Sequence, residues 1–146
     1  MDFNARGAGP NRGGVPATGP ARPPRLAPPS APESGPKTFT VRFDFDSDYM
    51  TLRNTAQVSA AARYAAANPG AKVAVQGVRA ATLLSDGKAM VETSAIAEQR
   101  AEKVALALRE IGIASTRLEV SWRDATQEAR GIEDYQNRRV DIRVSP

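Results

Sequence analysis

A change of residue pattern near position 37 restricts the possible folds of this chain more than any other feature. Nine of its 11 Pro residues lie between Pro10 and Pro36, where apolar side chains are few. Pro lacks a backbone N–H, and such a segment buries too little apolar surface to offset the entropy of ordering it. The sequence therefore predicts an extended or disordered tail or tether over residues 1–36 and one folded domain over residues 37–146.

Alternation of apolar and polar side chains predicts four strands, each with one buried face. The first begins at Thr38, and the second runs through Val73 and Val75 and stops at Gly77. The third and fourth are marked by apolar residues at every second position: Leu118, Val120 and Trp122, then Val140, Ile142 and Val144. We expect Trp122 to belong to the core rather than to form a platform for a sugar ring.

Two helices are predicted between these strands. Thr51 is a suitable N-cap for a helix that runs to about Ala67. A second helix, ended by Gly112, has apolar residues on one face at helical spacing: Met90, Ala97, Ala101, Val104, Leu108 and Ile111. The order is β-α-β-α-β-β, so the predicted fold class is α+β, a sandwich of two helices on one mixed four-stranded sheet.

The composition argues against several classes of function. The chain has no Cys and no His, so we expect no zinc or copper site, no cofactor and no enzyme that uses a thiol or an imidazole. The net charge of +4 would suit an acidic partner, but the charges alternate in sign and the aromatic residues are scattered, so nucleic-acid binding is not expected. No stretch approaches the roughly 18 to 20 apolar residues that span a bilayer.

Several short motifs carry a resemblance to a known family. Val41-Arg42-Phe43-Asp44-Phe45-Asp46-Ser47 belongs to the first strand and its turn, and Asn68-Pro69-Gly70-Ala71-Lys72-Val73 follows the first helix. Arg100-Ala101-Glu102-Lys103-Val104 lies in the second helix, and Asn137-Arg138-Arg139-Val140-Asp141-Ile142 comes near the end. Their order and spacing, over about positions 38 to 145, resemble those of the OmpA-like peptidoglycan-binding domains.

The resemblance implies noncovalent binding of peptidoglycan through the diaminopimelate of its peptide stem. The carboxylate of that group needs a guanidinium, and its amine needs a carboxylate. By position, Arg100 matches the arginine of the family's helix, with an exposed helical Arg beside Glu98 or Glu102 as the alternative. Thr93 stands at the position of the Asn in the family's helix motif, so this chain differs from the family there.

The resemblance also places the chain's last strand at the ligand site. Asn137 is expected to stabilise the loop before this strand, and Arg138 or Arg139 to line the site. Adjacent residues on a strand face opposite ways, so only one of the two arginines can do so.

The acidic half of the site departs from the family pattern. The family has Gly-His-Thr-Asp directly after its second strand, whereas this chain has Gly77-Val78-Arg79-Ala80, which puts Ala80 at the carboxylate position. The segment between Gly77 and Arg100 is several residues longer than usual, so Asp86 is the candidate for a displaced carboxylate. The alternative is a loop Asp that caps the coming helix near Lys88.

Two functions remain open. The first is a non-catalytic domain of the periplasm or cell envelope that associates with peptidoglycan and anchors an attached structure to the wall. The second is a degenerate domain that no longer binds peptidoglycan and serves as a protein-interaction module in a larger assembly, such as a secretion channel, a pilus base or a virion. In both cases we expect the segment from Pro10 to Pro36 to contact a protein partner. Residues 1–7 lack the apolar core of a secretion signal. An envelope protein needs such a signal for export, whereas a virion component does not.

Overall fold

The computed structural model describes residues 35–146, so most of the predicted tail lies outside the described residues. In chain order the strands and helices are β1 (Lys37–Arg42), α1 (Leu52–Ala67), β2 (Lys72–Arg79), β3 (Ala81–Leu83), β4 (Ala89–Val91), α2 (Ile96–Ile111), β5 (Leu118–Asp124) and β6 (Arg139–Ser145). Three short 3-10 turns flank β5 or precede β6: η2 (Ser115–Arg117), η3 (Thr126–Glu128) and η4 (Asp134–Asn137).

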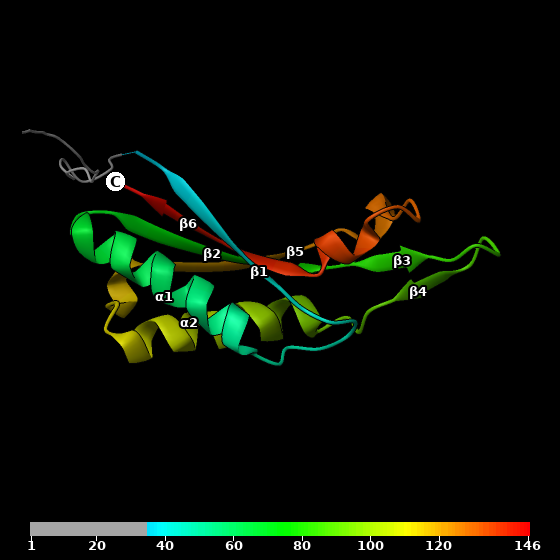
Figure 1. Ribbon diagram of the computed structural model, residues 1–146, viewed down its shortest axis with the longest axis horizontal. Helices are drawn as coiled ribbons and strands as arrows, with labels where there is room; N and C mark the ends of the chain where they lie inside the picture. Colours follow the sequence, from blue (N-terminus) through cyan, green and yellow to red (C-terminus); the bar gives the residue numbers. More distant parts are fainter. Residues whose placement is uncertain (1–34) are drawn as a thin grey trace, which may run out of the picture. The chain divides into compact units, whose positions relative to one another are not determined.

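Four of the described strands form one mixed sheet in the order β1-β6-β2-β5. β6 runs antiparallel to both β1 and β2, while β2 and β5 run parallel to each other. Both helices cover the same face of this sheet (Figure 1). The predicted α+β architecture, two helices packed on a mixed four-stranded sheet, is confirmed.

The core lies between the two helices and the sheet. The three neighbouring strands β1, β6 and β2 each direct alternate apolar residues towards it: Phe39, Val41, Val140, Ile142, Val144, Val73 and Val75. α1 packs through small side chains, as its weak apolar stripe predicts, with Val58, Ala61, Ala62 and Ala65 buried. Thr51 caps this helix, because its hydroxyl oxygen accepts the N–H of Asn54 at 3.1 Å.

Gly77 sets the close approach of α2 to the sheet. A Cβ at this position would lie 2.0 Å from the carbonyl oxygen of Ala97, so only a residue without a side chain fits. The prediction that β2 stops at Gly77 is wrong, because the strand continues to Arg79. Gly77 therefore allows the first turns of α2, which carry Arg100, to lie over the end of β2.

The longer segment after β2 folds into a hairpin, which the residue pattern did not predict. β3 and β4 pair antiparallel, with Ala81 opposite Val91, and this arm (residues 81–91) extends beyond the sheet (Figure 1). Met90 lies in β4 and is exposed, so its assignment to the second helix is wrong. The spacing of seven between Met90 and Ala97 fitted a helix by coincidence, since a turn separates the two residues.

The expected burial of Trp122 is also wrong. Its side chain is 49% exposed, because β5 is the edge strand and has a neighbour, β2, on one side only. Val120 on the same strand is partly exposed for the same reason. The alternation of apolar residues in β5 thus identified a strand correctly, but not its depth in the fold.

Candidate functional site

Arg100 lies in the second turn of α2 on the side that faces the sheet, and its side chain is fully buried. The central carbon of its guanidinium lies 5.3 Å from the centre of the Phe43 ring. A buried charge is strongly unfavourable unless it is paired and hydrogen-bonded. The environment of Arg100 must therefore supply acceptors for the guanidinium.

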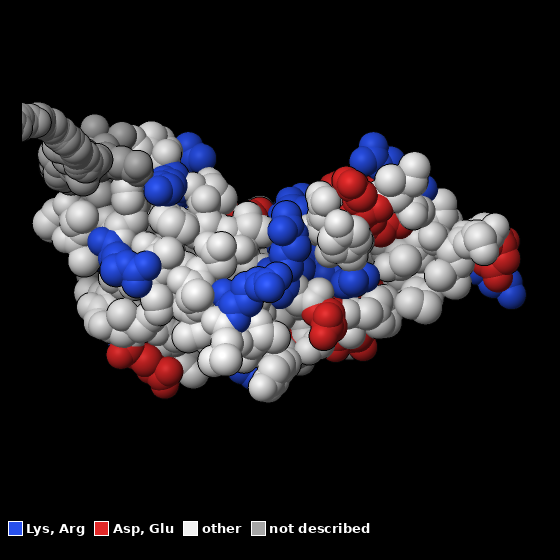
Figure 2. Space-filling view, viewed as in Figure 1, with Lys and Arg blue, Asp and Glu red and all other residues white. Residues whose placement is uncertain are grey.

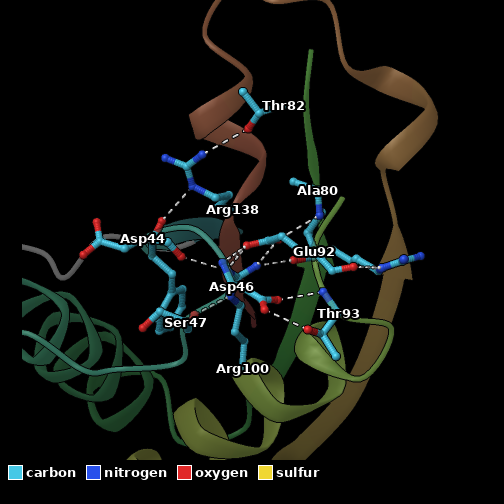
Figure 3. A network of polar contacts seen from close by, with 12 residues as sticks. Asp44, Asp46, Ser47, Ala80, Thr82, Glu92, Thr93, Arg100 and Arg138 are labelled. Atoms are coloured by element: carbon cyan, nitrogen blue, oxygen red, sulfur yellow. Dashed lines mark hydrogen bonds and ion pairs between the residues drawn. The ribbon is translucent and has the colours of Figure 1, made fainter. Parts of the chain in front are cut away.

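Every N–H of the Arg100 guanidinium has an acceptor within the chain (Figure 3). Three backbone carbonyls accept from Nε, Nη1 and Nη2: those of Ser47 at 2.8 Å, Val78 at 3.0 Å and Asp44 at 3.1 Å. Nη1 also donates to Oε1 of Glu92 at 2.7 Å, and Nη2 donates to Oε2 of the same carboxylate. A guanidinium has five N–H donors, so none remains for a ligand. We call Arg100 and the four residues that accept its hydrogen bonds the arginine cage: Arg100, Asp44, Ser47, Val78 and Glu92.

Glu92, which follows β4 directly, is as deeply buried as Arg100. Its carboxylate also accepts the backbone N–H of Ala80 at 3.0 Å and that of Asp46 at 2.6 Å. Together with the two bonds from Arg100, four donors surround this carboxylate. Arg100 therefore has an acidic partner, although Ala80 stands at the family's acidic position, and that partner comes from the base of the arm.

Glu92 was not predicted as a site residue, because the assignment of Met90 to the second helix placed Glu92 in that helix as well, whereas it follows a strand of the arm. Pairing of β3 with β4 returns the chain to its starting point, and the N–H of Glu92 donates to the carbonyl of Ala80 at 3.1 Å. One signal could have revealed this. Asp86-Gly87 lies between two short runs of apolar residues, and an Asp-Gly pair in that position favours a hairpin.

Asp46 and Thr93 close the exposed side of the cage. The Asp46 carboxylate accepts the backbone N–H of Thr93 at 2.7 Å and its hydroxyl at 2.8 Å. These hydrogen bonds from Thr93, the backbone bond first, hold the pKa of Asp46 below its ordinary value. Thr93, a predicted ligand position, thus fixes the segment after β1 to the start of α2.

Arg138 directly precedes β6 and Arg139 is its first residue, and the two side chains contact different parts of the chain. Arg138 lies beside the cage (Figure 3), where its Nε donates to the carbonyl of Phe43 at 3.2 Å and its Nη1 to the Thr82 hydroxyl at 3.4 Å. Its Nη2 makes no hydrogen bond or ion pair with any described residue. Asp44, next to Phe43 in the chain, is exposed, and its carboxylate has no such partner within residues 35–146 either.

Arg139 and Asn137 line a different site. They contribute, with Arg42 and Arg130, to a cavity of about 680 Å³ that we call the polar pocket. Arg139 Nε pairs with Asp141 at 3.0 Å, and its Nη1 donates to Oδ1 of Asn137 at 3.1 Å. The structure therefore divides the predicted set, with Arg100, Thr93 and Arg138 at the cage and Asn137 and Arg139 at the polar pocket.

Asp86 belongs to neither site. It lies in the turn of the arm, where its carboxylate accepts the N–H of Lys88 at 2.9 Å. The three residues of β3 put this turn about 10 Å from the base of the arm. The structure therefore places Asp86 away from Arg100, whose acidic partner is Glu92, and Asp86 caps no helix.

Two further features of residues 35–146 bear on function. This part of the chain holds no group of three or more acidic residues placed to bind a metal ion. None of its helices is long and apolar enough to cross a membrane.

Solved structures show what this fold is similar to, although no family model and no curated protein matches the sequence. The OmpA-like domain of FopA1 from Francisella tularensis is 17% identical, with a TM-score of 0.59 over 76% of this chain and 73% of that one. The peptidoglycan-associated lipoprotein from Burkholderia pseudomallei is 26% identical, with a TM-score of 0.55 over 73% and 90%. The C-terminal domain of Helicobacter pylori MotB is 20% identical, with a TM-score of 0.59 over 73% and 84%.

Proposed function

We propose that this domain, whose fold is OmpA-like, is a non-catalytic module of the periplasm or cell envelope that associates with peptidoglycan and anchors the chain attached to it. The fold supports a role of this kind, because one of the similar structures is by name a peptidoglycan-associated lipoprotein. Fold alone does not specify a ligand. The proposal therefore depends on which charged groups near the cage can reach one.

Two groups of opposite charge at the rim of the cage carry the proposal. Arg138 has an unengaged Nη2, and the exposed Asp44 carboxylate has no partner among the described residues. The carbonyl of Phe43, which accepts from Arg138, belongs to the residue directly before Asp44. A diaminopimelate carries a carboxylate and an ammonium group, which suit a guanidinium and a carboxylate respectively. We assign the first contact to Arg138 and the second to Asp44.

In this proposal Arg100 has a structural role and does not contact the ligand. A ligand carboxylate could reach its guanidinium only by displacing Glu92, and breaking a buried ion pair costs about 3–5 kcal/mol. In place, Arg100 holds the carbonyls of Asp44 and Ser47, which fixes the segment that carries the Asp44 side chain. The contact that the family resemblance implies for Arg100 thus moves to Arg138 at the rim.

Cosedimentation with purified peptidoglycan sacculi tests the proposal. The wild-type chain is expected to pellet with the sacculi, and Arg138→Gln and Asp44→Asn each to reduce the bound fraction at least about tenfold, the effect of 1.4 kcal/mol. Arg143→Gln is the matched control, because Arg143 is an exposed arginine of β6, the strand that follows Arg138, and has no partner among the described residues. Binding that survives in both rim variants would show that the wall is held elsewhere.

A second function is favoured by one specific observation. All five donors of Arg100 are engaged inside the chain, which suits a domain that has given up its ligand and uses the cage to fix the arm as part of a protein assembly. That function predicts no pelleting of the wild-type chain above background. Such a result would rule out wall binding and support the role in an assembly.

A further inference from the structure

The polar pocket lies on the face of the sheet opposite the helices. Thr40 and Arg42 on β1 alternate with buried residues that point into the core, and Arg139 on β6 does the same. Segment 127–137 closes the other side of the pocket. The volume of about 680 Å³ falls within the range of small-molecule sites, about 300–1,000 Å³.

Three arginines supply this pocket with hydrogen-bond donors. The guanidiniums of Arg42 and Arg130 make no hydrogen bond or ion pair with any residue from 35 to 146. Arg139 is engaged through Nε and Nη1 with Asp141, Asn137 and the carbonyl of Gln136. Its Nη2 has no partner in the described part of the chain, so donors of all three arginines remain for a ligand.

Arg42 and Arg139 form a pair of like charges. They are directly opposite each other in the antiparallel pairing of β1 with β6, so their side chains leave the same face of the sheet. Like charges in this arrangement are destabilising. Among the described residues Asp141 forms an ion pair with Arg139 and accepts the hydroxyl of Thr40 at 3.1 Å, but it forms no ion pair with Arg42. Figure 2 shows Lys and Arg side chains gathered over the end of β1, beside a hollow in the surface. An anion between the two guanidiniums would relieve their repulsion.

The acidic residues of the pocket wall are largely engaged elsewhere. Asp134 accepts three backbone N–H groups, from Leu83 at 2.9 Å, Arg130 at 2.8 Å and Gly131 at 2.7 Å, and these bonds, that from Leu83 first, lower the pKa of its carboxyl. Glu128 pairs with Arg123 at 2.9 Å. Glu133 accepts from the Gln136 amide at 3.3 Å. Available donors therefore outnumber available acidic groups.

We propose that the polar pocket binds a small polar ligand carrying an oxyanion, a carboxylate or a phosphate. Arg42 and Arg139 hold the oxyanion between them, since a guanidinium donates two parallel hydrogen bonds to such a group. Arg130 contacts it from the loop side, and the amides of Gln127 and Asn137 suit hydroxyl or amide groups of the ligand. This site is independent of the wall contact at the cage.

Titration of the full 146-residue, ¹⁵N-labelled chain tests this site, with shifts of backbone and arginine N–H resonances as the readout. The probes are D-glucuronate, D-glucose 6-phosphate and neutral D-glucose, all at one ionic strength set with sodium chloride. We expect saturable shifts at residues 40–42 and 127–139 with at least one anionic sugar and none with glucose. The anion that binds more tightly identifies the oxyanion. Absent, unsaturable or scattered shifts with both anions would overturn the proposal.

Arg42→Gln provides the mutational arm, with Arg143→Gln as its matched control. The Arg42 variant is expected to weaken anion binding at least about tenfold without a fall in melting temperature, because it removes a like-charge repulsion. The Arg143 variant is expected to bind as the wild type does. Unchanged binding by Arg42→Gln would overturn the assignment, and so would a loss of binding that merely follows a loss of folded protein.

Discussion

The arginine cage and the polar pocket use the same side chain in opposite ways. In the cage, Arg100 is fully buried and donates all of its N–H groups to three carbonyls and Glu92. In the polar pocket, Arg42 is exposed opposite Arg139 and has no partner within residues 35–146. A guanidinium with every donor engaged stabilises a fold, whereas one with donors remaining can bind a ligand. Position in a sequence motif does not distinguish the two cases, but the acceptors around each arginine do.

Removing the cage arginine should have the largest effect. Arg100→Met is expected to lower the free energy of unfolding by about 3–5 kcal/mol, because Glu92 is left buried without its ion-pair partner. Denaturant unfolding of the variant measures this loss. Arg109→Met, at an exposed position near the end of the same helix, is the control and should change stability by less than about 0.5 kcal/mol. A similarly small change in Arg100→Met would contradict a structural role for the cage.

The approach of α2 to β2 provides the second test. Gly77→Ala is expected to destabilise the domain by about 1–3 kcal/mol, because the new methyl group meets the carbonyl oxygen of Ala97 and the helix must shift. Gly70→Ala is the control, since a Cβ there has no neighbour within 4 Å. Equal melting temperatures for the two variants would mean that the position of Arg100 does not depend on this contact.

Acidification should lower the free energy of unfolding by a smaller amount, because it protonates Asp46 at the exposed side of the cage. The folded-state pKa of Asp46 is lowered, so its contribution to stability is present above the ordinary value of 3.8 and is lost as the pH falls through the folded value. We expect less than about 1 kcal/mol, because solvent screens this exposed group. Comparing the acid unfolding of wild type with that of Asp46→Asn measures the contribution. Identical pH dependence of the two would contradict it.

Neutralising an arginine of the polar pocket should have the smallest effect on stability. Arg42→Gln is expected to change the free energy of unfolding by less than about 0.5 kcal/mol, since its guanidinium has no partner in the described residues. Denaturant unfolding beside Arg100→Met gives the comparison directly. A loss of several kcal/mol would show that the two regions do not differ as described.

Local patterns in the sequence predicted most of the fold. Alternation placed β1, β2, β5 and β6, and Thr51 with the spacing of Val58, Ala62 and Ala65 placed α1. Three residues show the limit of such patterns. Gly77 does not end β2, Trp122 is half exposed at an edge, and Met90 lies in the arm. In each case the neighbouring strand or helix decides the outcome, and a local pattern does not reveal that neighbour.

The candidate site was less predictable than the fold. Arg100 was singled out, but its acidic partner Glu92 is brought to it by strand pairing in the arm, which no helical or alternating pattern indicated. That only one of Arg138 and Arg139 can face a given site was predictable, because it follows from the geometry of a strand. Which site each arginine reaches, and which of its donors remain, depends on its partners, Phe43 and Thr82 for Arg138 and Asp141 for Arg139.

A titration that observes individual arginine side chains tests the central claim most directly. The chain, labelled with ¹⁵N in arginine, is titrated with a soluble muropeptide that contains a diaminopimelate stem. The Nε–H resonance of Arg138 is expected to shift in a saturable way, while that of Arg100 stays in place and remains protected from exchange with water, because its donors are engaged with Glu92 and three carbonyls. A saturable shift of Arg100 with Arg138 unmoved would contradict the claim.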